Sequence, residues 1–270
     1  MPHTLVTGAT GTLGTALRSR LTAAGHTVTA TSRNPPTSSQ EGTDVRWRKL
    51  DLRDDSPLAS TLEPVDVVVH AATAPRGDTE AVDVHGTRRL LDAATAADVD
   101  HFVYPSIVGC DDIPYTYYRH KRTAETAVTE SATPATVVRS TQFHSFLADL
   151  LDAISRLPVW PLPTSVELQP VDVTDAAARI VDHATEPASG RLDPIGGPRV
   201  HTVRDLAAAY RDARGLRRPI VRLPLPGETL GAFAAGHATC PRHAAGTTTW
   251  QDWLTTHYQS DDANPRAHHE

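Results

Sequence analysis

The sequence of 270 residues lacks several features that would define other classes of protein. It has two cysteines, Cys110 and Cys240, which give no disulfide framework and fit a reducing cytosol. No apolar run approaches the roughly 20 residues of a membrane span. The opening "MPHTLVTGATG" enters a strand at once and has no signal-peptide pattern. We therefore expect a cytoplasmic protein that does not enter a membrane.

The chain also lacks an excess of positive charge. The formal net charge is -6, which argues against a general nucleic-acid surface or an anionic-membrane surface. No Gly-x-Ser-x-Gly or His-Glu-x-x-His motif supports a hydrolase. His237, Cys240 and His243 stand at intervals of three, but a closed zinc site needs a fourth ligand and none is near. We expect a small-molecule substrate, no metal, and a monomer or homodimer.

Strand-like and helix-like segments alternate through the first half of the chain. Leu13, Leu17 and Leu21 form a helical stripe between two of the strand-like runs. The run "VDVVVHAAT" is almost continuously apolar at first, as expected of a strand buried on both faces of a parallel sheet. The pattern predicts an α/β fold with a Rossmann-type, doubly wound parallel sheet of six or more strands, the first ending near Thr7.

A glycine-rich turn follows the first predicted strand. In "VTGATGTLG", Gly8 permits a tight turn, Gly11 lets the backbone approach a pyrophosphate, and Gly14 lets the helix pack closely. A diphosphate would lie on the free N–H groups at the helix N-terminus. A turn without a ligand is the alternative, but the strand–turn–helix context favours a dinucleotide site. The remaining residues expected at this site are Thr10, Thr12 and Leu13.

The end of the second predicted strand indicates which dinucleotide binds. An acidic residue there would hold a ribose 2′-hydroxyl and select NAD. The chain instead reads "ATSRNPP", where Arg33 can pair with a 2′-phosphate and Ser32 can add a hydroxyl contact. Arg33 as a solvated loop residue is the alternative. The missing acid favours NADP as the cofactor.

The composition of the sequence changes near "RLPVWPLPTS", which is too rich in proline to form regular secondary structure throughout. We expect an NADP-binding core over residues 1–157 and a small C-terminal substrate-binding region over 158–260. Part of that region, about 166–185, reads as one more strand and helix returning to the core sheet. Residues 261–270 are polar and are expected to be a disordered tail.

The order of the motifs resembles a known family. "TGATGTLG", "TSRNP", "LDLRD", "VVHAAT", "VDVHGTRRLLDAA", "FVYPSIVG", "YYRHK" and "VVRSTQFHSFL" occur in the order of the short-chain dehydrogenase/reductase superfamily. The chain most resembles its atypical, NmrA-like or NAD(P)-binding-domain branch. "LQPVDVTDAA", "IGGP" and "TTTWQDWL" are similar to an actinobacterial subgroup of that branch.

The resemblance implies further site residues. Asp51 and Leu52 would flank the adenine of the cofactor, and the cofactor would also be lined by Ala71, Ala72 and Thr73. Ser106, Tyr117 and Lys121 match the Ser–Tyr–Lys triad of the family. Where many members have an asparagine before "xxGT", this chain has Asp83, which puts the proton relay through that asparagine in question.

Tyr117 and Lys121 stand four apart and so share one face of a predicted helix. A phenol has a pKa of about 10, and a nearby ammonium would lower it. Tyr117 would then protonate a carbonyl oxygen that Ser106 also holds, while Lys121 would hold the nicotinamide ribose. Taken alone, a Tyr-x-x-x-Lys pattern is usually incidental; its place after the fifth strand favours a functional pair.

The segment "RSTQFHSF" follows the sixth predicted strand. There Gln142, Phe143 and His144 are candidate substrate-binding residues, although Phe143 in the core and His144 in a loop are equally good interpretations. The sequence as a whole favours an NADP(H)-dependent reductase of a small carbonyl or related unsaturated group. A non-catalytic NADP-binding sensor and a non-redox epimerase, dehydratase or cyclase on the same fold are the alternatives.

Overall fold

A computed structural model describes residues 1–36, 45–54, 58–224 and 226–262. The chain divides into two compact units. The first unit consists of Met1–Asp111, Tyr115–Arg139 and Ala176–Asp193. The second consists of Asp112–Pro114, Ser140–Asp175 and the chain from Pro194 onward. The units do not follow the boundary expected at residue 157, because residues 140–157 belong to the second unit.

The first unit is built on a seven-stranded sheet with the order β3-β2-β1-β4-β5-β6-β9. The chain begins at the centre, moves to one edge and then crosses to the other side, which is the doubly wound arrangement. The prediction of a parallel sheet is confirmed, and its first strand ends at Thr7, as expected. The strands are β1 (His3–Thr7), β2 (Thr27–Ser32), β3 (Val45–Lys49), β4 (Val67–His70), β5 (His101–Ile107), β6 (Ala135–Ser140) and β9 (Gly190–Arg191).

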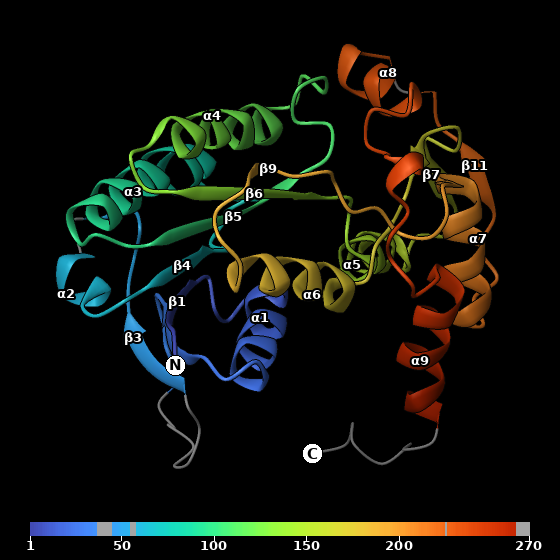
Figure 1. Cartoon of the computed structure of the whole chain (residues 1–270). Coiled ribbons are helices and arrows are strands. Elements are labelled where there is room, and N and C mark those ends of the chain that lie inside the picture. The colour runs from blue at the N-terminus through green and yellow to red at the C-terminus, as the bar shows by residue number, and fades with distance from the viewer. Residues whose placement is uncertain (37–44, 55–57, 225, 263–270) are drawn as a thin grey trace. The chain divides into compact units, whose positions relative to one another are not determined.

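Helices cover both faces of this sheet (Figure 1). One face packs Val6, Val69 and Val103 against α1 and α6, through a core that includes Leu17 and Ile180. The other face packs on α2, α3 and α4 through a second apolar core. The helices are α1 (Thr12–Ala23), α2 (Leu58–Leu62), α3 (Thr87–Ala96), α4 (Thr116–Glu130) and α6 (Val173–Ala184).

A π-helix, η1 (Glu80–Gly86), runs directly into α3. No sequence motif pointed to this wider turn. Its centre holds Asp83, which is fully buried. Single π-turns are often found at functional sites, and this one lies beside the residues that follow β4.

The second unit contains two small two-stranded sheets and several helices. Buried Gln169 joins distant loops of this unit. Its side-chain amide donates to the Gly197 carbonyl at 2.8 Å and accepts from the Cys240 N–H at 2.7 Å. The elements are α5 (His144–Ile154), β7 (Trp160–Leu162), β8 (Glu167–Leu168), β10 (His201–Thr202), α7 (Val203–Ala213), β11 (Ile220–Arg222), α8 (Glu228–Ala234), the 3-10 turn η2 (Pro241–His243) and α9 (Trp250–Asp262).

Two expectations for the C-terminal part need correction. Of the strand and helix expected to return to the core sheet over about 166–185, the helix does so as α6, but the strand does not, because β8 pairs with β10 in a separate sheet. The strand that does return is β9, which pairs in parallel with β6. α9 extends through Asp262, and the rest of the predicted tail lies outside the described residues. Among the described helices, none has the length and apolarity to cross a membrane.

Candidate active site

The glycine turn between β1 and α1 has almost no room for side chains. Gly8 has a φ of +63°, and a Cβ there would lie 2.7 Å from the Ala72 backbone. A Cβ on Gly14 would lie 2.2 Å from the Gly8 carbonyl oxygen, so the helix packs directly on the turn. Gly11 is the N-terminal cap of α1 and has no side-chain hydrogen bond. The result is a helix N-terminus with bare backbone beside it, which suits a diphosphate.

Ser32 and Arg33 follow at the end of β2. The Ser32 hydroxyl lies 3.2 Å from Oγ1 of Thr10, so the two predicted cofactor residues come from neighbouring turns. Ser32 Oγ also accepts the Asn34 N–H at 3.2 Å, which shapes the turn after the strand. The Arg33 side chain is exposed there. This arrangement leaves a guanidinium available beside the expected ribose.

Asp51 and Leu52 come directly after β3, next to a partner that the sequence motifs did not single out. Arg53 donates to both carboxylate oxygens of Asp51, with Nη2 2.6 Å from Oδ2. The hydrogen bonds from Arg53 lower the pKa of Asp51 to about 2. The Leu52 carbonyl accepts from Arg89, and a Cβ on Gly86 would meet Leu52 at 2.9 Å. A basic residue two positions after the acid was the available signal for this pair.

A buried histidine ties β1 to the segment that follows β4. His70 lies between two hydroxyls, with Nδ1 2.7 Å from Thr7 Oγ1 and Nε2 2.9 Å from Thr87 Oγ1. Burial and the nearby Lys121 charge lower the pKa of His70 to about 3, so the ring is neutral. The Ala72 N–H donates to Thr7 Oγ1 at 3.2 Å. These contacts fix the backbone of Ala71 and Ala72, and the sequence analysis missed the histidine behind them.

The triad residues lie on β5 and α4. Lys121 is buried and donates from Nζ to the Pro105 carbonyl at 2.9 Å, next to Ser106 in the chain. The same ammonium lies 4.0 Å from the centre of the Tyr104 ring. Burial lowers the pKa of Lys121, and the Asp83 and Glu125 carboxylates oppose this effect. Within the described residues, the buried Ser106 Oγ has no hydrogen-bond partner, as expected of a group that meets a ligand.

Tyr117 is half-buried in the first turn of the same helix and reaches the segment after β4. Its hydroxyl lies 3.2 Å from Thr73 Oγ1, and that atom lies 2.6 Å from Asp83 Oδ1. Burial raises the pKa of Tyr117, and the Asp83 charge raises it further. This direction is opposite to the lowering that the nearby lysine led us to expect. A phenol in this environment keeps its proton, which suits a proton donor rather than a base.

The predicted substrate residues belong to the second unit. Gln142 and His144 are buried, and Phe143 forms an isolated parallel β-bridge with Val171. The His144 ring packs against Trp250 and Trp253, with ring centres 5.6 and 5.8 Å away. This aromatic environment shows that His144 is not an ordinary loop residue. Whether the three residues bind substrate stays a prediction.

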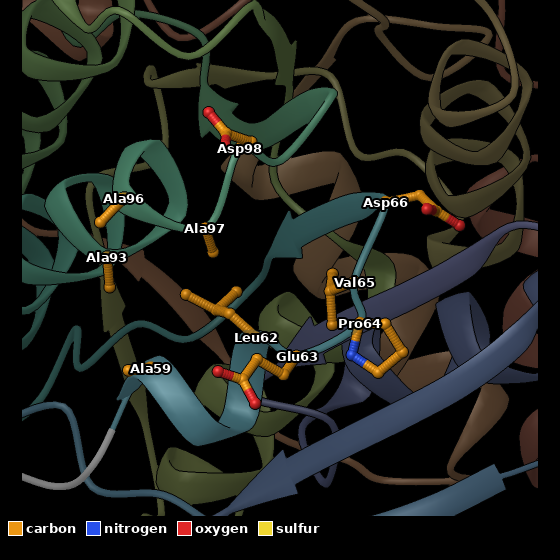
Figure 2. A pocket seen from close by; sticks show the side chains of 10 residues that line it. All are labelled: Ala59, Leu62, Glu63, Pro64, Val65, Asp66, Ala93, Ala96, Ala97 and Asp98. Carbon is orange, nitrogen blue, oxygen red and sulfur yellow. The ribbon is translucent and has the colours of Figure 1, made fainter.

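The predicted cofactor residues and the triad all lie in the first unit, at the carboxyl ends of β1, β2, β3, β4 and β5. A surface pocket of about 380 Å³ lies elsewhere (Figure 2). It precedes β4, where Leu62, Pro64 and Asp66 face the C-terminal end of α3. The pocket is therefore at the opposite ends of the strands from the triad. Among the described residues, no group of three or more histidine, cysteine or acidic side chains is placed to hold a metal.

The residues present fit a dinucleotide on two structural grounds. Gly8 and Gly14 let the turn pack closely against α1, and Gly11 leaves the start of this helix without a side-chain cap, which forms a cradle of backbone N–H groups. The buried hydroxyl of Ser106 is left for a ligand to satisfy. Gly11 and the start of α1 would hold the diphosphate, Arg33 and Ser32 the 2′-phosphate, and Lys121 the nicotinamide ribose. Proteins with this fold bind ligands at the carboxyl ends of the sheet strands.

Comparisons with known proteins identify relatives of this chain. Residues 8–149 match the family model described as NAD(P)H-binding. A Streptomyces griseus protein, (4-alkanoyl-5-oxo-2,5-dihydrofuran-3-yl)methyl phosphate reductase, is 32% identical over 243 residues, which cover 88% of this chain and 81% of that protein. An uncharacterized Mycobacterium tuberculosis protein is 28% identical over 225 residues, and the match covers 82% of this chain but only 24% of that longer protein.

Solved structures show the same fold. The NADPH complex of an NADPH-dependent quinone oxidoreductase from Escherichia coli superposes with a TM-score of 0.80 at 19% identity. The match covers 94% of this chain and 99% of that one. The fold, the glycine cradle and the family match lead to one conclusion. The chain belongs to the NAD(P)H-binding family.

Proposed function

We propose that the protein is an NADP(H)-dependent reductase of a small organic carbonyl or related unsaturated group. One observation carries this proposal. Tyr117 and Lys121, one turn apart on α4, contact the ends of two adjacent strands, through Thr73 after β4 and Pro105 in β5. Adjacent strand ends are where this fold binds its ligands. The exposed Arg33 in place of an acid supports NADP over NAD.

Each triad residue then has a defined task. The reduced cofactor, when bound, supplies a hydride to the carbonyl carbon. Tyr117 donates its hydroxyl proton to the carbonyl oxygen, so that the carbonyl becomes an alcohol and the phenol becomes a phenolate. Lys121 stabilises that phenolate with its ammonium, and solvent returns the proton. Ser106 donates a hydrogen bond to the same oxygen as negative charge develops on it.

The chemistry of the Streptomyces relative guides the choice of substrates. Its name gives a phosphate ester of an alkanoyl oxo-dihydrofuran as the compound that it reduces. The Escherichia coli structure is titled a quinone oxidoreductase. The test therefore uses a panel of quinones, unsaturated ketones and acylated furanone phosphates with NADPH. NADPH absorbance and mass spectrometry of the products follow the reaction.

Tyr117→Phe is the decisive variant. We expect it to lower kcat about 10²–10⁴-fold, the usual contribution of a general acid, while the Kd for NADPH stays nearly unchanged. Tyr115→Phe is the matched control, because Tyr115 is an exposed neighbour and its loss should leave kcat intact. Normal turnover by Tyr117→Phe would move the role to another proton donor. NADPH binding without reduction of any compound would favour the sensor or the non-redox enzyme.

A further inference from the structure

Asp83 is an acid where the family resemblance implies an asparagine. Its side chain is fully buried at the centre of the π-helix η1. Oδ1 lies 2.6 Å from Thr73 Oγ1, and Oδ2 accepts the Ala74 N–H at 3.0 Å. Both oxygens therefore serve as hydrogen-bond acceptors.

This carboxylate decides which way the neighbouring hydrogen bonds run. Thr73 has a single hydroxyl proton, and its Oγ1 contacts both Asp83 and the Tyr117 hydroxyl. A carboxylate can only accept, so Thr73 donates its proton to Asp83. Oγ1 then has only lone pairs to offer Tyr117 at 3.2 Å. The tyrosine must donate, and the chain runs from Tyr117 through Thr73 to Asp83.

We propose that Asp83 is a positioning residue that fixes the direction of this hydrogen-bond chain and so holds Tyr117 in its protonated, donating form. This inference rests on the proposed role of Tyr117 as the acid of a reductase. It also gives the departure from the family asparagine a physical meaning. The acid stabilises the phenol form of Tyr117 both through the chain and through its negative charge.

An asparagine at this position would reverse the chain. The Ala74 N–H still needs an acceptor, so the carboxamide oxygen would face Ala74 and its NH₂ group would face Thr73. Thr73 would then accept from the amide and donate its own proton to the Tyr117 oxygen. A hydrogen bond donated to that oxygen favours phenolate. Aspartate and asparagine, although nearly equal in shape, therefore have opposite effects on Tyr117.

Other groups also act on Tyr117, and they remain in place when Asp83 is replaced. Within the first unit, the titratable and charged groups around the Tyr117–Asp83 pair come from β4, β5 with the turn that follows it, and α4: His70, Tyr104, Cys110, Tyr118, Lys121 and Glu125. Asp83 raises the pKa of Lys121 as well, against the burial of the amine. The removal of the Asp83 charge should thus lower the pKa of both Tyr117 and Lys121.

The direct test is carbon-13 NMR of the protein labelled at the tyrosine ring carbon that bears the hydroxyl, without cofactor. Tyr117→Phe assigns the resonance. Asp83→Asn should lower the Tyr117 pKa by about 1–3 units, the usual effect of a charge within about 6 Å. Unchanged Tm and NADPH Kd would show that the variant is folded. The proposal would be overturned if Tyr117 of Asp83→Asn stays protonated up to the same pH as in the unchanged protein.

Thr73→Val provides a second, independent test if Asp83→Asn does not fold. Valine removes the hydroxyl and keeps the carboxylate. If Tyr117 donates to Thr73, the loss of that acceptor lowers the Tyr117 pKa. If Thr73 donates instead, its loss raises the pKa or leaves Tyr117 protonated throughout, and the proposal fails. The sign of the shift therefore decides the direction of the chain.

Enzyme kinetics separate this proposal from the reductase function. Reduction requires protonated Tyr117, so its rate falls as pH rises through the Tyr117 pKa. Asp83→Asn should move that alkaline fall to lower pH by the shift seen in NMR, and by much less in a Thr73→Val background. An alkaline limb that does not move would overturn the role of Asp83. If the unchanged protein reduces nothing, the reductase proposal fails while the NMR result still decides the direction of the chain.

Discussion

Replacing Gly14 with alanine tests the cradle that the proposed cofactor site depends on. The added Cβ would lie 2.2 Å from the Gly8 carbonyl oxygen and 2.7 Å from the Ala9 Cα, where ordinary contacts begin at 3.4 Å. Both obstacles are backbone atoms, which cannot rotate away as a flexible side chain does. The turn and the start of α1 must therefore move apart.

Two effects of opposite sign set the magnitude. Overpacking costs about 1–3 kcal/mol and occasionally more, and a backbone clash belongs at the upper end of that range. Alanine in place of glycine within a helix returns about 1 kcal/mol. The free energy of unfolding should fall by about 2 kcal/mol. For a unit of this size, that lowers Tm by roughly 4–8 °C.

Gly11→Ala is the matched control, one turn earlier in the chain. Gly11 has a φ of -73° and a ψ of 169°, which alanine adopts freely, and its Cβ would meet only the Gly8 oxygen at 3.2 Å. Its Tm should change less than that of Gly14→Ala, while its NADPH affinity should fall because the Cβ occupies the expected diphosphate surface. Circular dichroism melting and calorimetric titration measure the two quantities. A Gly14→Ala protein that melts at or above the original temperature would refute the close packing.

Two further predictions each concern one charged residue, Arg33 in the first unit and Asp172 in the second. Arg33→Ala should weaken NADPH binding roughly tenfold or more and leave NADH binding nearly unchanged, because a charge-assisted hydrogen bond contributes about 1.5–3 kcal/mol; equal losses in calorimetric titration would contradict the 2′-phosphate contact. In the second unit, the facing His144 imidazole, 3.8 Å away, and the hydrogen bonds from Thr174 lower the pKa of Asp172 to about 2. Because the folded pKa is depressed, this stabilisation is present above about pH 4 and is lost as pH falls toward 2. In urea unfolding, the free energy of unfolding of Asp172→Asn should fall less steeply over that pH interval than that of the unchanged protein. An equal slope in the two proteins would show that the contact does not stabilise the folded chain.

Local patterns were enough for the parts of the fold that depend on neighbours in the chain. The apolar run that ends at Thr7, the glycines that follow it and the stripe of leucines on α1 each predict their own element. Gly8 and Gly14 were predicted with the correct physical roles, since a tight turn and close packing allow no side chain. The alternation of such elements also determined the doubly wound sheet, because parallel strands need helical crossovers.

Short-range patterns failed where pairing partners were distant or turns were irregular. "LQPVDV" has the composition of a core strand, yet Leu168 pairs with His201 in another sheet, because a two-residue strand takes whichever edge its unit offers. No sequence motif pointed to the π-turn of η1, which runs directly into α3. Asp51 was expected near the adenine, but its bidentate pairing with Arg53 depends on side-chain geometry.

The chemistry of the candidate site was decided mainly by tertiary structure. The sequence identified Tyr117 and Lys121 as a pair, and from that pair alone the Tyr117 pKa was expected to fall. In the folded chain, burial raises it and the Asp83 charge adds to the rise. Thr73 and Tyr117 are 44 residues apart, and only the packing of α4 against the end of β4 joins them. A sequence names the ionisable groups, whereas desolvation and hydrogen-bond direction depend on which distant groups the fold places around them.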